Sequence, residues 1–202
     1  MTDFRIAAAR FVAGLVRPSK EANRQQLESR GESVSSLVIR ETTESDIPAL
    51  AQLHVTTWND TYAPLLMNGP PVSVRAYQWR EAFAQNDGSW FCYVIEAHNG
   101  ELIGFAKGTR DDPSSTSGQL SKIYLLRDYQ RMGLGRRLVG LVVRRFLSQG
   151  VTQIWSFVDP RNPSCAFYEA LGAENPIEDG KVNDSSYVWN DLHKLAAICP
   201  AE

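Results

Sequence analysis

The sequence has few of the features that mark a specialised class of protein. Its 202 residues contain three cysteines, Cys92, Cys165 and Cys199, which lie far apart and show no metal-ligand spacing. The pattern predicts neither a disulfide framework nor a zinc site, and it is typical of a reducing compartment. We therefore expect a cytoplasmic protein without a metal.

Long apolar runs are also missing. Arg10 separates the apolar residues 6–9 from residues 11–16, which leaves no unbroken stretch of signal-peptide length, and no run approaches the length of a membrane span. The net charge of −2 gives no basic excess. Neither a nucleic acid nor a membrane is therefore an expected partner. The hydrophobic content of 43% is sufficient for one sizeable core.

The chain divides near residue 37. Residues 3–16 carry apolar side chains at helical spacing and predict a short amphipathic helix, whereas residues 18–36 form a polar connector that has no core of its own. We predict an N-terminal extension over 1–36, dispensable for chemistry, and a folded domain over 37–202. The helix is expected to dock on the domain or on a second subunit, which allows a homodimer; membrane attachment or targeting is the alternative.

Strand and helix patterns alternate after residue 37. The expected strands are Leu37–Arg40, Trp90–Ile95, Leu102–Lys107, Leu120–Leu126, Thr152–Val158 and Tyr187–Leu192. The expected helices cover residues 46–58, 74–84, 133–148 and 162–172. Asn99-Gly100 predicts a hairpin turn between the second and third strands. Together these patterns predict an α/β fold: a mixed central sheet with helices on both faces.

A glycine-containing loop follows the strand that begins at Leu120. The residues from Leu120 to Gly135 place a strand, a loop with two glycines and a helix start in sequence, where backbone amides can face phosphate oxygens. Four arginines lie within eleven residues in and directly after this segment: Arg127, Arg131, Arg136 and Arg137. The pattern predicts a diphosphate ligand, with ordinary surface charges as the alternative.

Two other phosphate-binding motifs fail on spacing. Leu138 stands where a dinucleotide fingerprint needs its third glycine. No Gly-Lys-Ser/Thr follows, as a nucleoside-triphosphate loop would require.

The loop resembles the signature of a known family. Gln130-Arg-Met-Gly-Leu-Gly135 is similar to the Gln/Arg-x-x-Gly-x-Gly/Ala motif of the GNAT family of N-acetyltransferases. About thirty residues downstream, Asn162 to Gly172 resembles the family's Asn-to-Phe-Tyr-Glu-x-Leu-Gly segment. Ile39–Glu41, Trp58–Tyr62 and the hairpin resemble its opening, so that the likeness covers residues 37–195. The resemblance implies a GNAT-like fold and acetyl-CoA as the cosubstrate.

The resemblance also implies which residues bind the cosubstrate. Backbone groups of Ile123, Tyr124 and Leu125 would hold the pantetheine arm and the thioester carbonyl. The phosphates would lie on the loop and helix start, which comprise Gln130, Arg131, Met132, Gly133, Leu134, Gly135, Arg136 and Arg137. Asn162 would contact the cofactor arm, although a helix N-cap explains this residue equally well.

The catalytic residue implied by the resemblance is Tyr168, which would protonate the departing thiolate. A phenol of pKa about 10 is protonated at neutral pH and suits this role. A packing role is the alternative. Trp58 and Tyr62 stand where the resemblance places acceptor-binding loops; they would bind a cationic amine by cation–π contact or serve in the core.

The general base remains open. Glu96, also a candidate for acceptor binding, Glu41 and Asp159 are the candidate bases. Many relatives carry Glu where Gln119 stands, and an amide cannot act as a base. Arg127 also replaces a proline that is common in the family.

The predicted function is transfer of an acetyl group from acetyl-CoA to a primary amine, with a small molecule such as a polyamine as the acceptor. One alternative is acetylation of a protein N-terminus or lysine. Another is a noncatalytic acetyl-CoA-binding regulator, which Gln119 keeps open and Tyr168 opposes.

Overall fold

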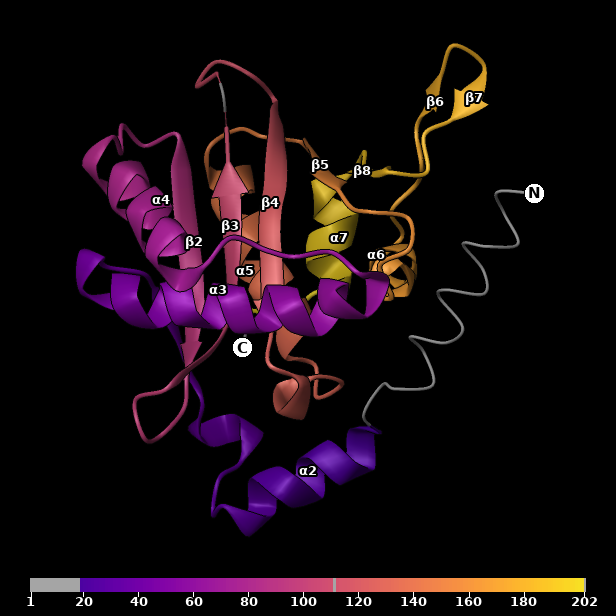
Figure 1. The fold of residues 1–202 in the computed structure, drawn as a ribbon. Coiled ribbons are helices and arrows are strands. Elements are labelled where there is room, and N and C mark those ends of the chain that lie inside the picture. The colour runs from indigo at the N-terminus through magenta and orange to yellow at the C-terminus, as the bar shows by residue number, and fades with distance from the viewer. Residues whose placement is uncertain (1–18, 111, 202) are drawn as a thin grey trace.

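The computed structural model describes residues 19–110 and 112–201 and contains one large sheet (Figure 1). Its strands are β1 (Val38–Glu41), β2 (Trp90–Glu96), β3 (Leu102–Thr109), β4 (Ser117–Leu125), β5 (Gln153–Phe157) and β8 (Ser186–Trp189). They lie in the order β1-β2-β3-β4-β5-β8, and all neighbours are antiparallel except β4 and β5. The expected mixed sheet is confirmed, as is the hairpin, in which Gly100 has a φ of +82°.

Two helices, α3 (Ile47–Tyr62) and α4 (Val72–Ala84), cover one face of the sheet. Helix α3 buries residues at a spacing of three or four, and Pro48 stands in its first turn, where a missing N–H costs nothing. Both helices pack on the strand residues Cys92, Val94 and Phe105. The buried residues of each helix therefore determine which side of the helix faces the sheet.

The opposite face is covered by α5 (Leu134–Ser148) and α7 (Leu192–Ile198). Helix α5 is strongly amphipathic: its buried side chains share one stripe, and they are Leu134, Leu138, Val139, Val142, Val143 and Phe146. Gly140 lets the backbone of Cys199 approach, because a Cβ there would lie 2.5 Å from the Cys199 carbonyl oxygen. The two helices are thereby held together behind the sheet.

Strands β4 and β5 pair over a short distance only. Their register runs from Ser117 opposite Gln153 to Gln119 opposite Trp155 and then stops. Beyond that point β4 continues to Leu125 beside β3, with a register shift between Lys107 and Gly108. The two parallel strands are therefore no longer paired with each other toward their carboxyl ends. Ligands bind at this end of the strands in open α/β sheets.

A helix occupies the segment that the sequence assigned to a polar connector. Helix α2 (Lys20–Ser29) begins at Ser19, whose hydroxyl accepts a hydrogen bond from the Ala22 amide. It buries only Asn23 and Leu27, which stand four residues apart on one face. Propensity and polarity gave no sign of this docking, because two buried residues suffice for it. The helix expected over residues 3–16 lies outside the described residues.

The remaining elements differ from expectation mainly at their ends. Helix α3 runs a turn beyond the expected residue 58, and the last strand ends at Trp189 before α7 begins at Leu192. The short elements are α6 (Cys165–Ala170), the hairpin β6 (Ile177–Glu178) and β7 (Lys181–Val182), and the 3-10 turns Val34–Ser36, Glu44–Asp46, Ala63–Leu65 and Arg127–Tyr129.

Candidate active site

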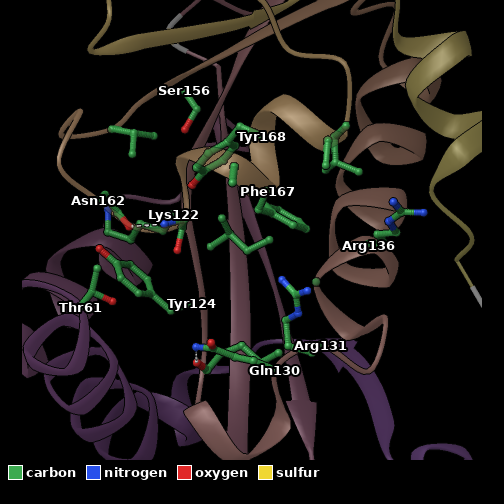
Figure 2. A pocket seen from close by; sticks show the side chains of 18 of the residues that line it. Thr61, Lys122, Tyr124, Gln130, Arg131, Arg136, Ser156, Asn162, Phe167 and Tyr168 are labelled. Atoms are coloured by element: carbon green, nitrogen blue, oxygen red, sulfur yellow. Dashed lines mark hydrogen bonds between the residues drawn. The ribbon is translucent and has the colours of Figure 1, made fainter. Parts of the chain in front are cut away.

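A cavity of about 470 Å³ lies where β4 and β5 separate. Ser121 to Leu125 of β4 form one wall, and Ser156 to Val158 form another. The start of α5 and one side of α6 complete it. Figure 2 shows Arg131 and Arg136 at one end, Lys122, Tyr124, Thr61 and Asn162 at the other, and Tyr168 between them. The cavity is therefore elongated, with arginines at one end only.

The arginine end is built on the N-terminus of α5. Gly133 is the N-cap residue of α5, and its φ of +87° is a conformation that residues with a side chain rarely adopt. The first hydrogen bond of the helix runs from the Arg137 amide to the Gly133 carbonyl oxygen. The preceding amides have no partner within the helix and, with the helix dipole, favour an anion. Arg131 and Arg136 line the cavity beside them. A diphosphate suits this arrangement.

The rest of the loop has structural roles. The Gln130 side chain donates to the Leu125 carbonyl oxygen at 3.0 Å and ties the loop to the end of β4. Met132 packs against the core and Leu134 is fully buried, so neither side chain lines the cavity. Arg137 does not line it either, and its Nε is buried without a hydrogen-bond partner among the described residues.

Tyr168 reaches the cavity from α6 and is 6% exposed. Burial raises the pKa of its phenol, and the nearby Tyr124 and Tyr62 act in the same direction. The side chain therefore stays protonated throughout the neutral range. Its ring stacks on Tyr187 at 5.3 Å between centroids, which fixes the direction of the hydroxyl.

Asn162 links the two sides of the cavity end that lies away from the arginines. Its side-chain amide donates to the Tyr62 hydroxyl at 2.9 Å, and its Oδ1 accepts from the Ser164 amide at 2.8 Å. Helix α6 begins two residues later than expected, with Ser164 rather than Asn162 at the N-cap position. The correction has a local cause: Asn162 makes a turn with its own backbone two residues on. Asn162 and its partner Tyr62 both line the cavity.

Other residues singled out in the sequence lie elsewhere. Trp58 stacks on Tyr62 at 4.8 Å and abuts Gly69, without lining the cavity. Glu96 forms an ion pair with Arg40 at 2.8 Å. The remaining base candidates are also outside: Glu41 is exposed on β1, and Asp159 pairs with Arg161, which keeps the pKa of its carboxyl low. Among the described residues, no carboxylate lines the cavity.

Sequence reasoning missed Lys122, the charged residue at the cavity end that lies away from the arginines. Lys122 lines the cavity and lies on β4 two residues before Tyr124, so the two side chains share a face of the sheet. The sequence did contain a signal for Lys122: in a strand, side chains two residues apart share a face, and Tyr124 was already a candidate. Ser156, Thr61 and Phe167 also line the cavity. They carry no motif, and only the fold brings them to the site.

The cavity combines a helix N-terminus suited to a diphosphate, an open strand and a protonated tyrosine, an arrangement that fits an acyl-CoA-dependent transferase. The model of the Acetyltransferase (GNAT) family matches residues 48–173. The chain belongs to this family, and acetyl-CoA is its cosubstrate.

Relatives and solved structures agree with this assignment. The chain is 26% identical over 174 residues to the uncharacterized N-acetyltransferase YuaI of Bacillus subtilis, covering 80% of this chain and 98% of the relative. It is 33% identical over 99 residues to the ribosomal protein bS18 alanine N-acetyltransferase of Escherichia coli, covering 48% and 65%.

Among solved structures, spermidine N-acetyltransferase from Vibrio cholerae in complex with CoA and spermine matches with a TM-score of 0.57 and 16% identity, covering 80% and 99%. This similarity supports the fold. Within the described part of the chain, no helix is long and apolar enough to cross a membrane.

Proposed function

We propose that the chain transfers an acetyl group from acetyl-CoA to a primary amine of a small molecule. The observation that carries the proposal is the continuous cavity from the α5 N-terminus to Tyr168, open between β4 and β5. The diphosphate would lie at Arg131 and Arg136, and the thioester would lie beside the β4 backbone at residues 123–125. The acceptor would enter from the end lined by Thr61 and Tyr62.

The reaction needs one nucleophile and one proton donor. The amine nitrogen attacks the thioester carbonyl carbon; a C–N bond forms, the C–S bond breaks, and the nitrogen loses a proton. The Tyr168 hydroxyl donates its proton to the sulfur that leaves and is reprotonated from solvent. Its raised pKa ensures that this proton is present at neutral pH.

The amine must arrive neutral, or lose its proton to water, because no described carboxylate lines the cavity. The positive charge of Lys122 at the acceptor end supports this route: a nearby cation disfavours an ammonium and lowers the pKa of a bound amine. The same charge weighs against the polyamine that the sequence favoured. We therefore propose a small amine of lower positive charge.

The test is release of CoA thiol from acetyl-CoA across a panel of small primary amines and N-terminal peptides, with the acetylated product identified by mass. Saturable release with a small amine, lost in a protein that no longer binds acetyl-CoA, is the expected result. Efficient acetylation of peptides alone would replace the small-molecule acceptor by a protein one. Binding of acetyl-CoA without transfer to any amine would contradict the proposal as a whole.

A further inference from the structure

Three cationic side chains gather between α4 and the sheet, beside the end of the cavity where the acceptor is proposed to enter. Lys107 on β3 and Lys122 on β4 are direct partners across the antiparallel ladder, so their side chains share one face of the sheet. Arg75 comes from α4 above them, and its charge lowers the pKa of the Lys122 ammonium, second in effect to burial. All three side chains are partly buried.

None of the three has an acidic partner among the described residues. The Lys107 ammonium lies 4.4 Å from the ring centre of Trp90 and 5.4 Å from that of Trp79, so that cation–π contact stabilises it in place of an ion pair. Arg75 donates to the Gln78 side chain at 3.0 Å, while its Nε is buried and has no hydrogen-bond partner within residues 19–110 and 112–201. Like charges opposite each other on a sheet destabilise it, and buried cations are normally paired.

A buried histidine beside these cations also has an unsatisfied polar atom among the described residues. His54 is 3% exposed, packs against Tyr124 at 5.3 Å between ring centres, and has an Nδ1 that finds no hydrogen-bond partner in the described part of the chain. The three cations all oppose its protonation. The cluster is therefore positive, poorly compensated and continuous with the active-site cavity through Lys122.

We propose that this cluster of Arg75, Lys107 and Lys122 binds an anionic group of the acceptor, so that the substrate is a small amine bearing a carboxylate or a phosphate. The inference rests on the proposed function and names its acceptor class. The anion supplies the counter-charge that the described residues lack. Lys122 faces the cavity and makes the direct contact, while Lys107 and Arg75 contribute charge from behind.

The test compares acceptors matched in size. CoA thiol release would be measured with full-length protein on 3-aminopropanoate and 2-aminoethyl phosphate as anionic amines, on 3-aminopropanamide and 2-methoxyethylamine as neutral ones, and on spermidine. We expect kcat/KM for at least one anionic amine to exceed that of its neutral counterpart by about ten- to a hundredfold, the range of one charge-assisted hydrogen bond. The two anionic arms distinguish carboxylate from phosphate.

Variants connect the preference to the cluster. Lys122→Met should reduce the ratio of anionic to neutral kcat/KM toward one, whereas Lys122→Arg should keep it. Lys107→Met should reduce the ratio partly. Lys181→Met, on the exposed strand β7, is the matched control and should leave the ratio unchanged. Thermal melting verifies that each variant is folded. If Lys122→Met does not fold, Lys107→Met tests the proposal in its place.

The outcomes separate the two proposals. A preference for spermidine or for the neutral amines overturns the anionic acceptor and leaves the acetyltransfer to a small amine standing. An anionic preference that survives both Lys122→Met and Lys107→Met removes the cluster from the assignment. If no amine of any class is acetylated although acetyl-CoA binds, the proposed function fails and the acceptor class fails with it.

Discussion

Tyr168 is buried and lines the cavity, where we propose that it faces the thioester. Phenylalanine keeps the ring that stacks on Tyr187 and removes the hydroxyl group that would donate the proton. We expect Tyr168→Phe to lower kcat by about a hundred- to ten-thousandfold, as for loss of a general acid, with acetyl-CoA affinity within a few fold. Steady-state kinetics with a good acceptor at neutral and high pH provide the measurement, because a slow release step would hide the effect. Wild-type turnover at both pH values would assign the proton donation to water.

The glycines of the loop can be predicted from the sequence, whereas Lys122 cannot. Gly133 and Gly135 lie in a short motif whose spacing has a backbone cause. Lys122 is an ordinary lysine in a strand, and its role depends on a partner strand and a helix that meet it only after folding. At the residue scale, prediction therefore succeeds where function resides in the backbone and fails where it resides in packed side chains.

At the scale of elements, the start of α5 offers a matched comparison between two glycines. Gly133 and Gly180 both have positive φ, +87° and +74°, and an added Cβ meets nothing at either. Alanine therefore introduces similar backbone strain at both, of about 1 to 2 kcal/mol. We expect Gly133→Ala to weaken acetyl-CoA binding by shifting the anion-binding amides, and Gly180→Ala, in the β6–β7 turn, to leave it unchanged. Calorimetric titration measures both; equal affinities would contradict the loop assignment.

Helix α2 positions that same loop from below. The Asn23 amide, 2% exposed, donates to the carbonyl oxygens of Arg127 and Gln130 at 2.8 and 2.9 Å. The helix also contacts Asp128 through Gln26 and Arg30. Asn23 therefore holds the backbone of the loop, and we expect it to act on the cosubstrate only through that backbone, as a positioning residue.

We expect Asn23→Ala to raise the KM for acetyl-CoA about tenfold, the effect of roughly 1.4 kcal/mol, with kcat nearly unchanged. Gln25→Ala is the control, because Gln25 is exposed and bonds only within the helix. A truncation that starts at residue 37 should behave like Asn23→Ala and keep its turnover at saturating acetyl-CoA. The expectation that residues 1–36 are dispensable then holds for chemistry but not for affinity. A KM unaffected by either change would make α2 a passive segment.

At the scale of the whole molecule, most of the sheet could be predicted from alternating and helical patterns. Strands such as Trp90–Glu96 and the helix Leu134–Ser148 carry strong periodicity, and their predicted positions agree with the structure within a few residues. Strand order and the separation of β4 from β5 are tertiary properties. The family resemblance implied a GNAT-like fold as a whole without giving either property, and no local pattern records which strands pair. The docking of α2 escaped both routes, since it lies before the region of resemblance.

The buried histidine makes the stability of the whole fold depend on pH. Burial first, and the charges of Arg75, Lys122 and Lys107 next, lower the pKa of His54 from 6.5 to about 3. The folded state keeps the ring neutral where the unfolded chain protonates it, so that stability is present above about pH 6.5 and is lost as the pH falls toward 3.

The size of this effect follows from linkage. One proton bound only by the unfolded chain corresponds to about 1.4 kcal/mol per pH unit, or about 2 kcal/mol between roughly pH 6 and 4.5. This window lies mostly above the range in which carboxylates titrate. His54→Phe, which suits the neighbouring rings of Trp79 and Phe105, should flatten the dependence there. His98→Gln, at an exposed turn, is the control. Urea unfolding at a series of pH values measures the slope, and a slope that is the same in wild type and His54→Phe would show that His54 is protonated equally in both states.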